Sequence, residues 1–228
     1  MSDLSYWGFT LRNTGANRLK IIAVALLLQL ALVPVMLSVS RSQAKYCIVC
    51  DSRLLESSMD SCRLQVGVVE ETGRNDGRQI EQYLASVGLG AGNPYCYAGQ
   101  YWCFAVAAKA LSLASSEIPI KKTGLASEAF FAAKKTGKRI KLFLAKYDLI
   151  VWRKGKTVFG HVERIVSVGK GGWVITVGFN TSGSVNGSQM KGEGVYQKKR
   201  NIYHLLGRMP LRGLIGFIAI NNVTKEGL

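Results

Sequence analysis

The chain has only two histidines and few acidic residues, 14 against 30 lysines and arginines. It has one CxxC pair, Cys47 and Cys50, and neither a second such pair nor a histidine lies near it. A zinc site takes about four such ligands, so none is expected here. No βαβ pattern surrounds the pair, which argues against a thioredoxin-like redox motif. The sequence therefore predicts no metal and no organic cofactor.

The shortage of acidic residues gives the chain a formal net charge of +16 at pH 7. Such a charge implies a polyanionic neighbour, namely nucleic acid, an anionic membrane or an acidic cell-wall polymer. The chain lacks zinc-finger spacing, an RNA-recognition motif and a single basic helix, so no specific nucleic-acid partner is expected. A solvated surface that aids solubility accounts for most of the charge. The basic clusters are Lys121–Lys122, Lys134–Lys141, Lys154–Lys156 and Lys198–Arg200.

The five cysteines are an odd number, so at least one is free or pairs with another chain. Cys47, Cys50 and Cys62 precede the main domain, and a disulfide among them is one expectation if the chain is exported. Cys96 and Cys103 lie within the domain. The spacing of the cysteines does not determine which of them form a disulfide.

A long apolar run without charge extends from Ile21 to Val39 and follows a basic flank. Its length is just sufficient for a helix to cross a bilayer. The basic flank predicts that the N-terminus stays in the cytoplasm and that the rest of the chain is exported. Residues 1–44 are therefore interpreted as a signal peptide cleaved after Ala44 or as an uncleaved membrane anchor. Either interpretation places the protein in the cell envelope, in the periplasm or on the extracellular face.

After a linker over residues 45–63, which could end in a short helix near Arg53–Ser61, the pattern becomes domain-like over 64–228. Helical periodicity comes first and an alternating, strand-like pattern follows. This order predicts an α+β domain with N-terminal helices packed on an antiparallel sheet. The expected helices span 80–88, 93–113 and 124–138, and the expected strands span 148–152, 161–168, 173–179, 195–200 and 214–220.

A reactive cysteine is predicted at the start of the central helix. Asn93 is a good N-cap, and Pro94 suits the first helical position. Cys96 then lies in the first turn, near unpaired backbone N–H groups and the positive end of the helix dipole, so it should carry more of the nucleophilic thiolate. Cys103 shares its face but sits between Trp102 and Phe104, where a buried role is simplest.

A cysteine nucleophile needs a base and a group that orients the base. His161 follows Gly160 at the start of a strand, whereas His204 lies in an irregular stretch, so His161 is the better base. Asn180 ends the strand that pairs with the His161 strand across a tight turn. The two ends lie close together in a hairpin, so Asn180 could fix the tautomer of His161. The predicted catalytic set is Cys96, His161 and Asn180.

At this point the residues resemble a known family. The segments 92–98, 148–152 and 160–162 are similar to the CHAP group of the papain-like amidase and peptidase superfamily. Upstream, 70–77 and 83–89 resemble the leader that precedes the cysteine in a bacterial and phage branch of that group. The resemblance implies a papain-like fold and an enzyme that cleaves amide bonds in peptidoglycan.

By this resemblance, the protein is an exported peptidoglycan amidase or endopeptidase with peptidoglycan and an anionic membrane or wall surface as partners. Cys96 would be the nucleophile, His161 the base and Asn180 part of the polar end of the site. Two other interpretations stay open. One is a catalytically weakened component of wall binding, secretion or conjugation, and the other is a toxin-like or cytosolic cysteine hydrolase.

The chain departs from the family pattern at the third catalytic group. Members of this branch often carry Glu-Gly-Asn-Thr where this chain has Gly178-Phe179-Asn180-Thr181, so the acidic residue is replaced by Gly178. Many members also have small residues where this chain has Glu163 and Arg164. Glu163 lies two residues from His161 and shares its face. It could replace the lost carboxylate or narrow the cleft.

Overall fold

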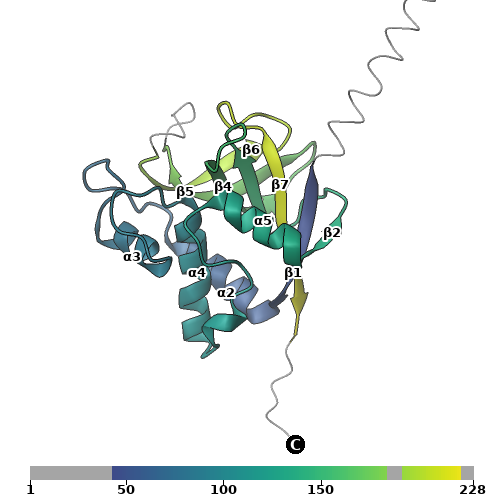
Figure 1. Cartoon of the computed structure of the whole chain (residues 1–228), viewed down its shortest axis with the longest axis horizontal. Coiled ribbons are helices and arrows are strands. Elements are labelled where there is room, and N and C mark those ends of the chain that lie inside the picture. Colours follow the sequence, from purple (N-terminus) through teal and green to yellow (C-terminus); the bar gives the residue numbers. More distant parts are fainter. Residues whose placement is uncertain (1–42, 184–191, 222–228) are drawn as a thin grey trace, which may run out of the picture. The chain divides into compact units, whose positions relative to one another are not determined.

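The computed structural model describes residues 43–183 and 192–221, which form an α+β domain (Figure 1). The predicted class is therefore confirmed. Its helices are α2 (Ser52–Leu64), α3 (Arg78–Ser86), α4 (Cys96–Ala110), the short 3-10 helix η1 (Ser115–Glu117) and α5 (Ala126–Thr136). Its strands are β1 (Ala44–Asp51), β2 (Lys138–Ile140), β3 (Leu149–Arg153), β4 (Gly160–Val168), β5 (Trp173–Thr181), β6 (Gly194–Asn201) and β7 (Leu211–Ile220).

The strands form one sheet in the order β2-β1-β7-β3-β4-β5-β6. The meander predicted from β3 to β6 is present, with β3, β4, β5 and β6 pairing antiparallel in sequence order. The prediction of a purely antiparallel sheet is wrong, because β1 pairs with β7 in parallel over its whole length. A parallel pair needs a crossover, and here the other helices and strands of the described residues lie between the two partners in sequence.

The prediction of a linker over residues 45–63 is also wrong, except for the short helix expected near its end. Residues 44–51 are a mostly buried strand inside the sheet, and 52–64 form α2. Asp51 starts α2, because its side chain accepts hydrogen bonds from the N–H groups of Arg53 at 2.8 Å and Leu54 at 3.2 Å. The domain therefore begins near Ala44, not at residue 64.

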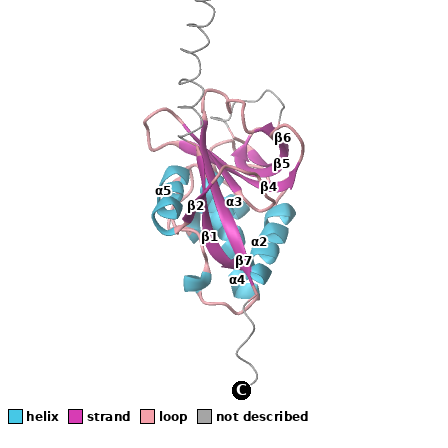
Figure 2. Cartoon of the chain, turned by 90° about the vertical axis from the view of Figure 1, so that its right-hand side faces the viewer, coloured by secondary structure: helices cyan, strands magenta, loops and turns pink. Residues whose placement is uncertain are grey.

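The two faces of the sheet are covered differently (Figure 2). Helices α4 and α5 pack with β1, β3 and β7 in one hydrophobic cluster. On the other face, Ile150, Trp152 and Ile165 pack with Ile202 and Leu206, which belong to the connection between β6 and β7. The packing on this side holds α4, which carries Cys96, in a fixed place above the meander.

Helix α4 is buried around most of its circumference, as expected for an internal helix. It begins at Cys96, with Tyr95 at the N-cap, so the predicted N-cap role of Asn93 is wrong. It lies close to β5 at Gly99, where a Cβ atom would overlap the ring of Phe179. This close approach brings the first turn of α4 down to the strands that carry His161 and Asn180.

The predicted apolar segment 21–39 lies outside the described residues. Within the part of the chain that the structure describes, no helix is long and apolar enough to span a bilayer. Ala44, the last residue of the predicted targeting segment, is buried and pairs with Gly213 in the sheet. The first strand of the domain therefore overlaps the end of that segment.

All five cysteines are free in the structure, so the disulfide considered among Cys47, Cys50 and Cys62 is not formed. The thiol of Cys62, on α2, instead hydrogen-bonds with Cys103 on α4. It also lies 3.8 Å from the Oε1 atom of Gln100. These contacts belong to the α2–α4 interface.

Candidate active site

The predicted nucleophile is the first residue of α4. The first helical hydrogen bond at this end runs from the N–H of Gly99 to the carbonyl of Tyr95, at 2.9 Å. The N–H groups of Cys96 and its two successors precede that bond and point along the helix toward its start. The Cys96 side chain is largely buried, with 6% of the residue exposed. Its sulfur lies 4.0 Å from the carbonyl oxygen of Gly160, the residue before His161.

The predicted base is in contact with the nucleophile. His161 is 3% exposed, and the thiol of Cys96 interacts with its ring and helps to raise the pKa of the imidazole. The structure therefore places the two predicted residues next to each other. The ring of Trp152, on the neighbouring strand β3, lies with its centroid 6.2 Å from that of His161 and forms one wall beside the imidazole.

Glu163, not Asn180, orients the imidazole. The Nε2 atom of His161 lies 3.2 Å from Oε1 of Glu163. The two residues are two positions apart on β4, and alternate residues of a strand project to the same face. Because Nε2 faces the carboxylate, Nδ1 is the ring nitrogen left for the thiol. The arrangement is a cysteine–histidine–glutamate line.

Glu163 occupies the space that a side chain at position 178 would take. Gly178 is its cross-strand partner on β5. A Cβ atom on Gly178 would lie 2.9 Å from both Cγ and Oε1 of Glu163. The glycine therefore makes room for the glutamate, and of the two interpretations of Glu163 the contacts favour the replacement of the lost carboxylate.

The Glu163 carboxylate is fully buried and has two partners besides His161. Arg200, on β6, donates from Nε to Oε2 at 2.9 Å and from Nη2 to Oε1 at 2.6 Å. Thr176, on β5, donates from Oγ1 to Oε2 at 2.6 Å. Both carboxylate oxygens are thereby engaged, and the carboxylate is held against the imidazole.

These contacts set the charges of the pair. Burial lowers the pKa of His161, but hydrogen bonds with Cys96 and Glu163 outweigh it and raise the pKa to about 9. Burial raises the pKa of Glu163, but its bonds with His161 and Arg200 outweigh it and lower the pKa to about 2. At neutral pH the site therefore holds an imidazolium beside a carboxylate.

Asn180 does not have the orienting role predicted for it. Its amide donates to Oδ1 of Asn75 and, at 3.5 Å, to Oε1 of Glu70. Asn180 has a positive φ of 51°, and the pairing of β5 with β6 shifts register between Gly178 and Thr181. This local irregularity turns the side chain toward the loop before α3 instead of toward His161.

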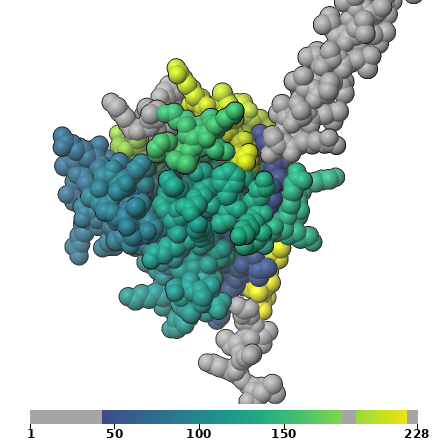
Figure 3. Space-filling model, in the orientation of Figure 1, coloured from purple at the N-terminus to yellow at the C-terminus, as the bar shows by residue number. Residues whose placement is uncertain are grey.

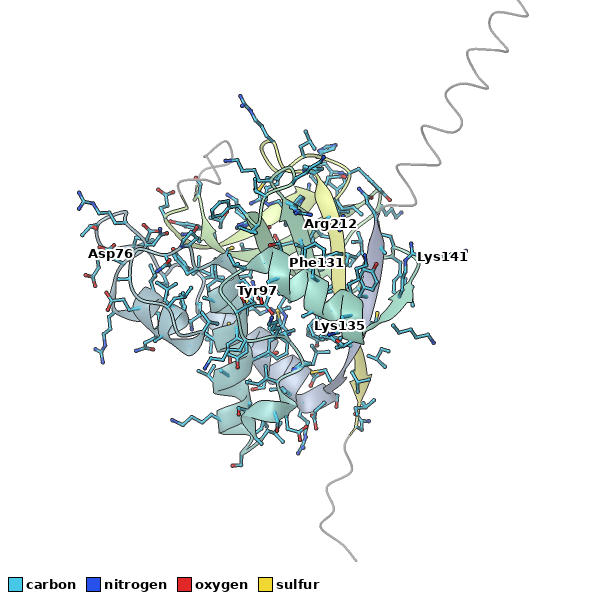
Figure 4. All side chains as sticks on the ribbon, viewed as in Figure 1. Asp76, Tyr97, Phe131, Lys135, Lys141 and Arg212 are labelled. Atoms are coloured by element: carbon cyan, nitrogen blue, oxygen red, sulfur yellow. The ribbon has the colours of Figure 1, made fainter. Side chains whose placement is uncertain are left out.

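A polar cluster around Glu70 joins this loop to the start of α4. Oε1 of Glu70 accepts from the hydroxyl of Tyr95 at 3.2 Å, and Oε2 accepts from the N–H of Asn75 at 2.9 Å. The carbonyl of Asn75 in turn accepts from the N–H of Gly92 at 3.0 Å. Figure 4 shows this loop beside α3, with Asp76 labelled in it. Tyr95 directly precedes Cys96, so the cluster positions the nucleophile.

An apolar cleft of about 390 Å³ opens beside Cys96. No charged side chain is among its lining residues. Its rim includes the exposed side chains of Leu125, Val158 and Phe159. Three parts of the chain line it: first Leu89, Asn93, Pro94 and Cys96, then Thr123–Ala126, and finally Val158–Gly160. The blue, teal and green surfaces of these parts of the chain meet on the face shown in Figure 3.

Comparisons with known proteins leave the family of this chain undecided. No family model, no curated protein and no solved structure matches it. The chemistry therefore has to be argued from the site itself.

Sequence reasoning missed Arg200 and Glu70. Arg200 was assigned to a solvated basic cluster, yet its side chain is 13% exposed and bonded to a buried carboxylate. Strand alternation could have indicated this, because Arg200 and Lys198 share one face of β6 and Lys199 points to the other. Glu70 gave no comparable signal, because its partners Tyr95 and Asn180 lie 25 and 110 residues away in the chain.

His204 lines a different pocket from the cleft beside Cys96. Its ring packs edge-on against Trp173, with the centroids 5.7 Å apart, in a pocket that Trp152 and Arg200 also line. Among the described residues, no group of three potential metal-ligating side chains is placed to hold an ion.

Proposed function

We propose that this protein is a cysteine-dependent amidohydrolase that cleaves peptide or amide bonds in peptidoglycan. The observation that carries the proposal is the line of Cys96, His161 and Glu163, in which the thiol lies at a helix start and the imidazole interacts with the thiol and hydrogen-bonds with the carboxylate. A buried cysteine of purely structural use needs no such base. A papain-like fold is proposed with it, supported by a helix that presents the nucleophile to a meander that presents the base.

In the proposed reaction, His161 enters as the imidazolium and Cys96 as the thiolate. The sulfur attacks the carbonyl carbon, and the oxygen that becomes negative is stabilised by backbone N–H groups at the start of α4. His161 donates its proton to the amine nitrogen as the C–N bond breaks, which leaves a thioester. Water then attacks the thioester, His161 accepts a proton from that water, and the C–S bond breaks to release the acid and the thiolate.

Glu163 keeps the imidazole in place and stabilises its charged form through both steps. Thr176 and Arg200 hold Glu163, so the carboxylate does not have to reorganise during the reaction. The intact set of contacts supports an active enzyme over a catalytically weakened, binding-only protein. The polar cluster at Glu70 and Asn180 supports the site by fixing Tyr95 and the loop before the nucleophile.

The apolar cleft suits a small uncharged residue next to the scissile bond, because no charged side chain lines it. The exposed lysines would serve a different purpose, namely retention near an anionic wall or membrane. Lys135 and Lys141, both exposed, are labelled on one side of the molecule in Figure 4. Export through residues 1–44 is part of this proposal, since peptidoglycan lies outside the cytoplasm.

The proposal is tested by digestion of purified peptidoglycan with the full chain in mild detergent, beside the Cys96→Ala and Cys103→Ala variants. We expect soluble fragments from the wild type and Cys103→Ala, and a loss of at least about 1,000-fold with Cys96→Ala. The fragment masses identify the bond. Equal release by Cys96→Ala, or no release by a wild type that is folded, would contradict the proposal.

A further inference from the structure

Arg200 reaches Glu163 across an intervening strand. Its backbone lies on β6 and Glu163 lies on β4, with β5 between them. β5 presents Gly178 and Thr176 on this face, and the glycine leaves the space through which the two side chains meet. Both ends of the guanidinium fork engage the carboxylate, with Nε and Nη2 each within 3.1 Å of Oε1. Such a two-nitrogen contact fixes orientation as well as charge.

The charged groups that face the pair come from three elements. Cys96 on α4 contacts the imidazole, and Glu163 lies beside it on β4. From β6, Arg200 contacts the carboxylate directly, and Lys198 interacts with it electrostatically while donating to the carbonyl of Ser182 at 2.8 Å. Arg200 is therefore the cation that forms an ion pair with Glu163, the carboxylate beside His161.

We propose that Arg200 is a positioning residue, which acts through Glu163 to set the pH range in which Cys96 and His161 form a reactive ion pair. This inference rests on the cysteine–histidine pair of the proposed function but not on the identity of the substrate. A strand-end arginine in a basic run is thus part of the machinery behind the catalytic histidine.

Removal of the guanidinium should make the thiolate harder to form in either of two ways. If Glu163 stays ionised, the guanidinium no longer neutralises its carboxylate, and this negative charge disfavours a thiolate at Cys96. If Glu163 instead takes up a proton, the imidazolium loses its ionised partner and stabilises the thiolate less. Both ways raise the pH at which Cys96 becomes reactive.

The test measures the rate of alkylation of Cys96 by iodoacetamide in the full chain over a series of pH values, with the labelled site identified by mass spectrometry. In Arg200→Gln, the pH of half-maximal rate should rise by about one unit or more. In Arg200→Lys it should rise by about half a unit, because an ammonium keeps the charge but cannot engage both oxygens. The matched control is Lys199→Gln, which removes an exposed charge from the next residue and should leave the profile unchanged.

A double variant tests whether the effect passes through the carboxylate. Glu163→Gln combined with Arg200→Gln should have the same profile as Glu163→Gln alone, and it leaves no unpaired buried charge. The proposal is overturned if the Arg200→Gln profile, or the Arg200→Lys profile should the first variant not fold, superimposes on the wild type. It is equally overturned if Lys199→Gln shifts the profile as much, or if Arg200→Gln adds a shift in the Glu163→Gln background. Alkylation needs no substrate, so a failure to digest peptidoglycan would leave this result intact.

Discussion

Helix α4 carries two cysteines whose surroundings differ in almost every respect. Cys96, at the first residue, borders a cleft and contacts His161. Cys103, two turns later, is fully buried and hydrogen-bonds with the thiol of Cys62. Burial raises the pKa of Cys103 well above its usual value, and the contact with Cys62 adds to this. The same residue type on the same helix is thus placed for reaction in one case and for packing in the other.

An arginine also lies in the surroundings of each cysteine, the partly buried Arg200 in one case and the fully buried Arg164 in the other. Arg200 is paired with Glu163, which connects it to His161 and Cys96. Arg164, near Cys103, donates to the carbonyl of Leu55 at 3.2 Å and the hydroxyl of Ser58 at 2.9 Å. Its guanidinium lies 4.5 Å from the centroid of the Phe104 ring. A cation near a thiol does not make a catalytic site unless a base and an open cleft accompany it.

The largest expected difference between the two thiols is in their rates of alkylation. Cys96 should react with iodoacetamide at least about 1,000-fold faster than Cys103 near neutral pH, because a buried thiol reacts only when the structure opens. Peptide mapping after timed labelling measures both rates in one sample. Equal, slow labelling of the two thiols would remove the basis for an activated Cys96.

Replacement of Glu163 by Gln should lower the rate of peptidoglycan hydrolysis by about 100-fold. The amide keeps the size of the side chain but loses the charge that stabilises the imidazolium. Glu117→Gln, an exposed site on η1, is the control and should retain wild-type activity. The rates are compared at saturating substrate after both variants are shown to be folded. Unchanged hydrolysis in Glu163→Gln would mean that His161 needs no carboxylate partner.

Moving the carboxylate from position 163 on β4 to position 178 on β5 should restore part of the activity that is lost when Glu163 is removed. Glu163→Ala leaves space beside Gly178, and Gly178→Glu in the same chain returns a carboxylate to that space. We expect the double variant to be about tenfold more active than Glu163→Ala alone. Gly178→Ala in the otherwise unchanged chain is the steric control, and its Cβ should destabilise the fold by about 1–3 kcal/mol. No recovery in the double variant would show that the exact strand position of the acid matters.

The stability of the protein should depend on pH through this pair. Because the pKa of His161 is raised to about 9, its contribution is fully present below about pH 6.5 and is lost as the pH rises through about 9. Because the pKa of Glu163 is lowered to about 2, its contribution is present above about pH 4.5 and is lost as the pH falls through about 2.

Each contribution should be on the order of 1–3 kcal/mol. Urea unfolding of the wild type and of His161→Gln at a series of pH values measures the histidine part as the difference between the two curves. A difference that does not shrink between about pH 6.5 and 9 would contradict the charged state of His161.

The smallest effect is expected at the other cysteine. Cys103→Ala should cost about 1 kcal/mol of stability, because it leaves a small cavity beside Cys62, while hydrolysis stays at the wild-type rate. Chemical denaturation gives the stability change, and the peptidoglycan assay gives the rate. A large loss of activity without a loss of stability would place Cys103 in the site.

Local patterns in the sequence were sufficient for the elements that depend on neighbours in the chain. The strands of the meander and helix α5 lie within a few residues of their predicted bounds, because alternation and helical periodicity reflect burial on one face. Local context was also sufficient to choose Cys96 as a site residue and to prefer His161 over His204. The linker prediction failed because β1 pairs with β7, at the far end of the chain, which no local pattern reveals.

The tertiary structure determined which side chains contact and orient His161. From the sequence, Asn180 and Glu163 were both available, since each lies on a strand near His161. A positive φ at Asn180 and a register shift on β5 turn its side chain away, and the missing side chain at Gly178 lets Glu163 take the place. Arg200 joins from a strand 37 residues later in the chain. The sequence by itself determined the candidate nucleophile, the candidate base and the helix and strand that carry them. The carboxylate that contacts the histidine depended on cross-strand space, which exists only in the folded sheet.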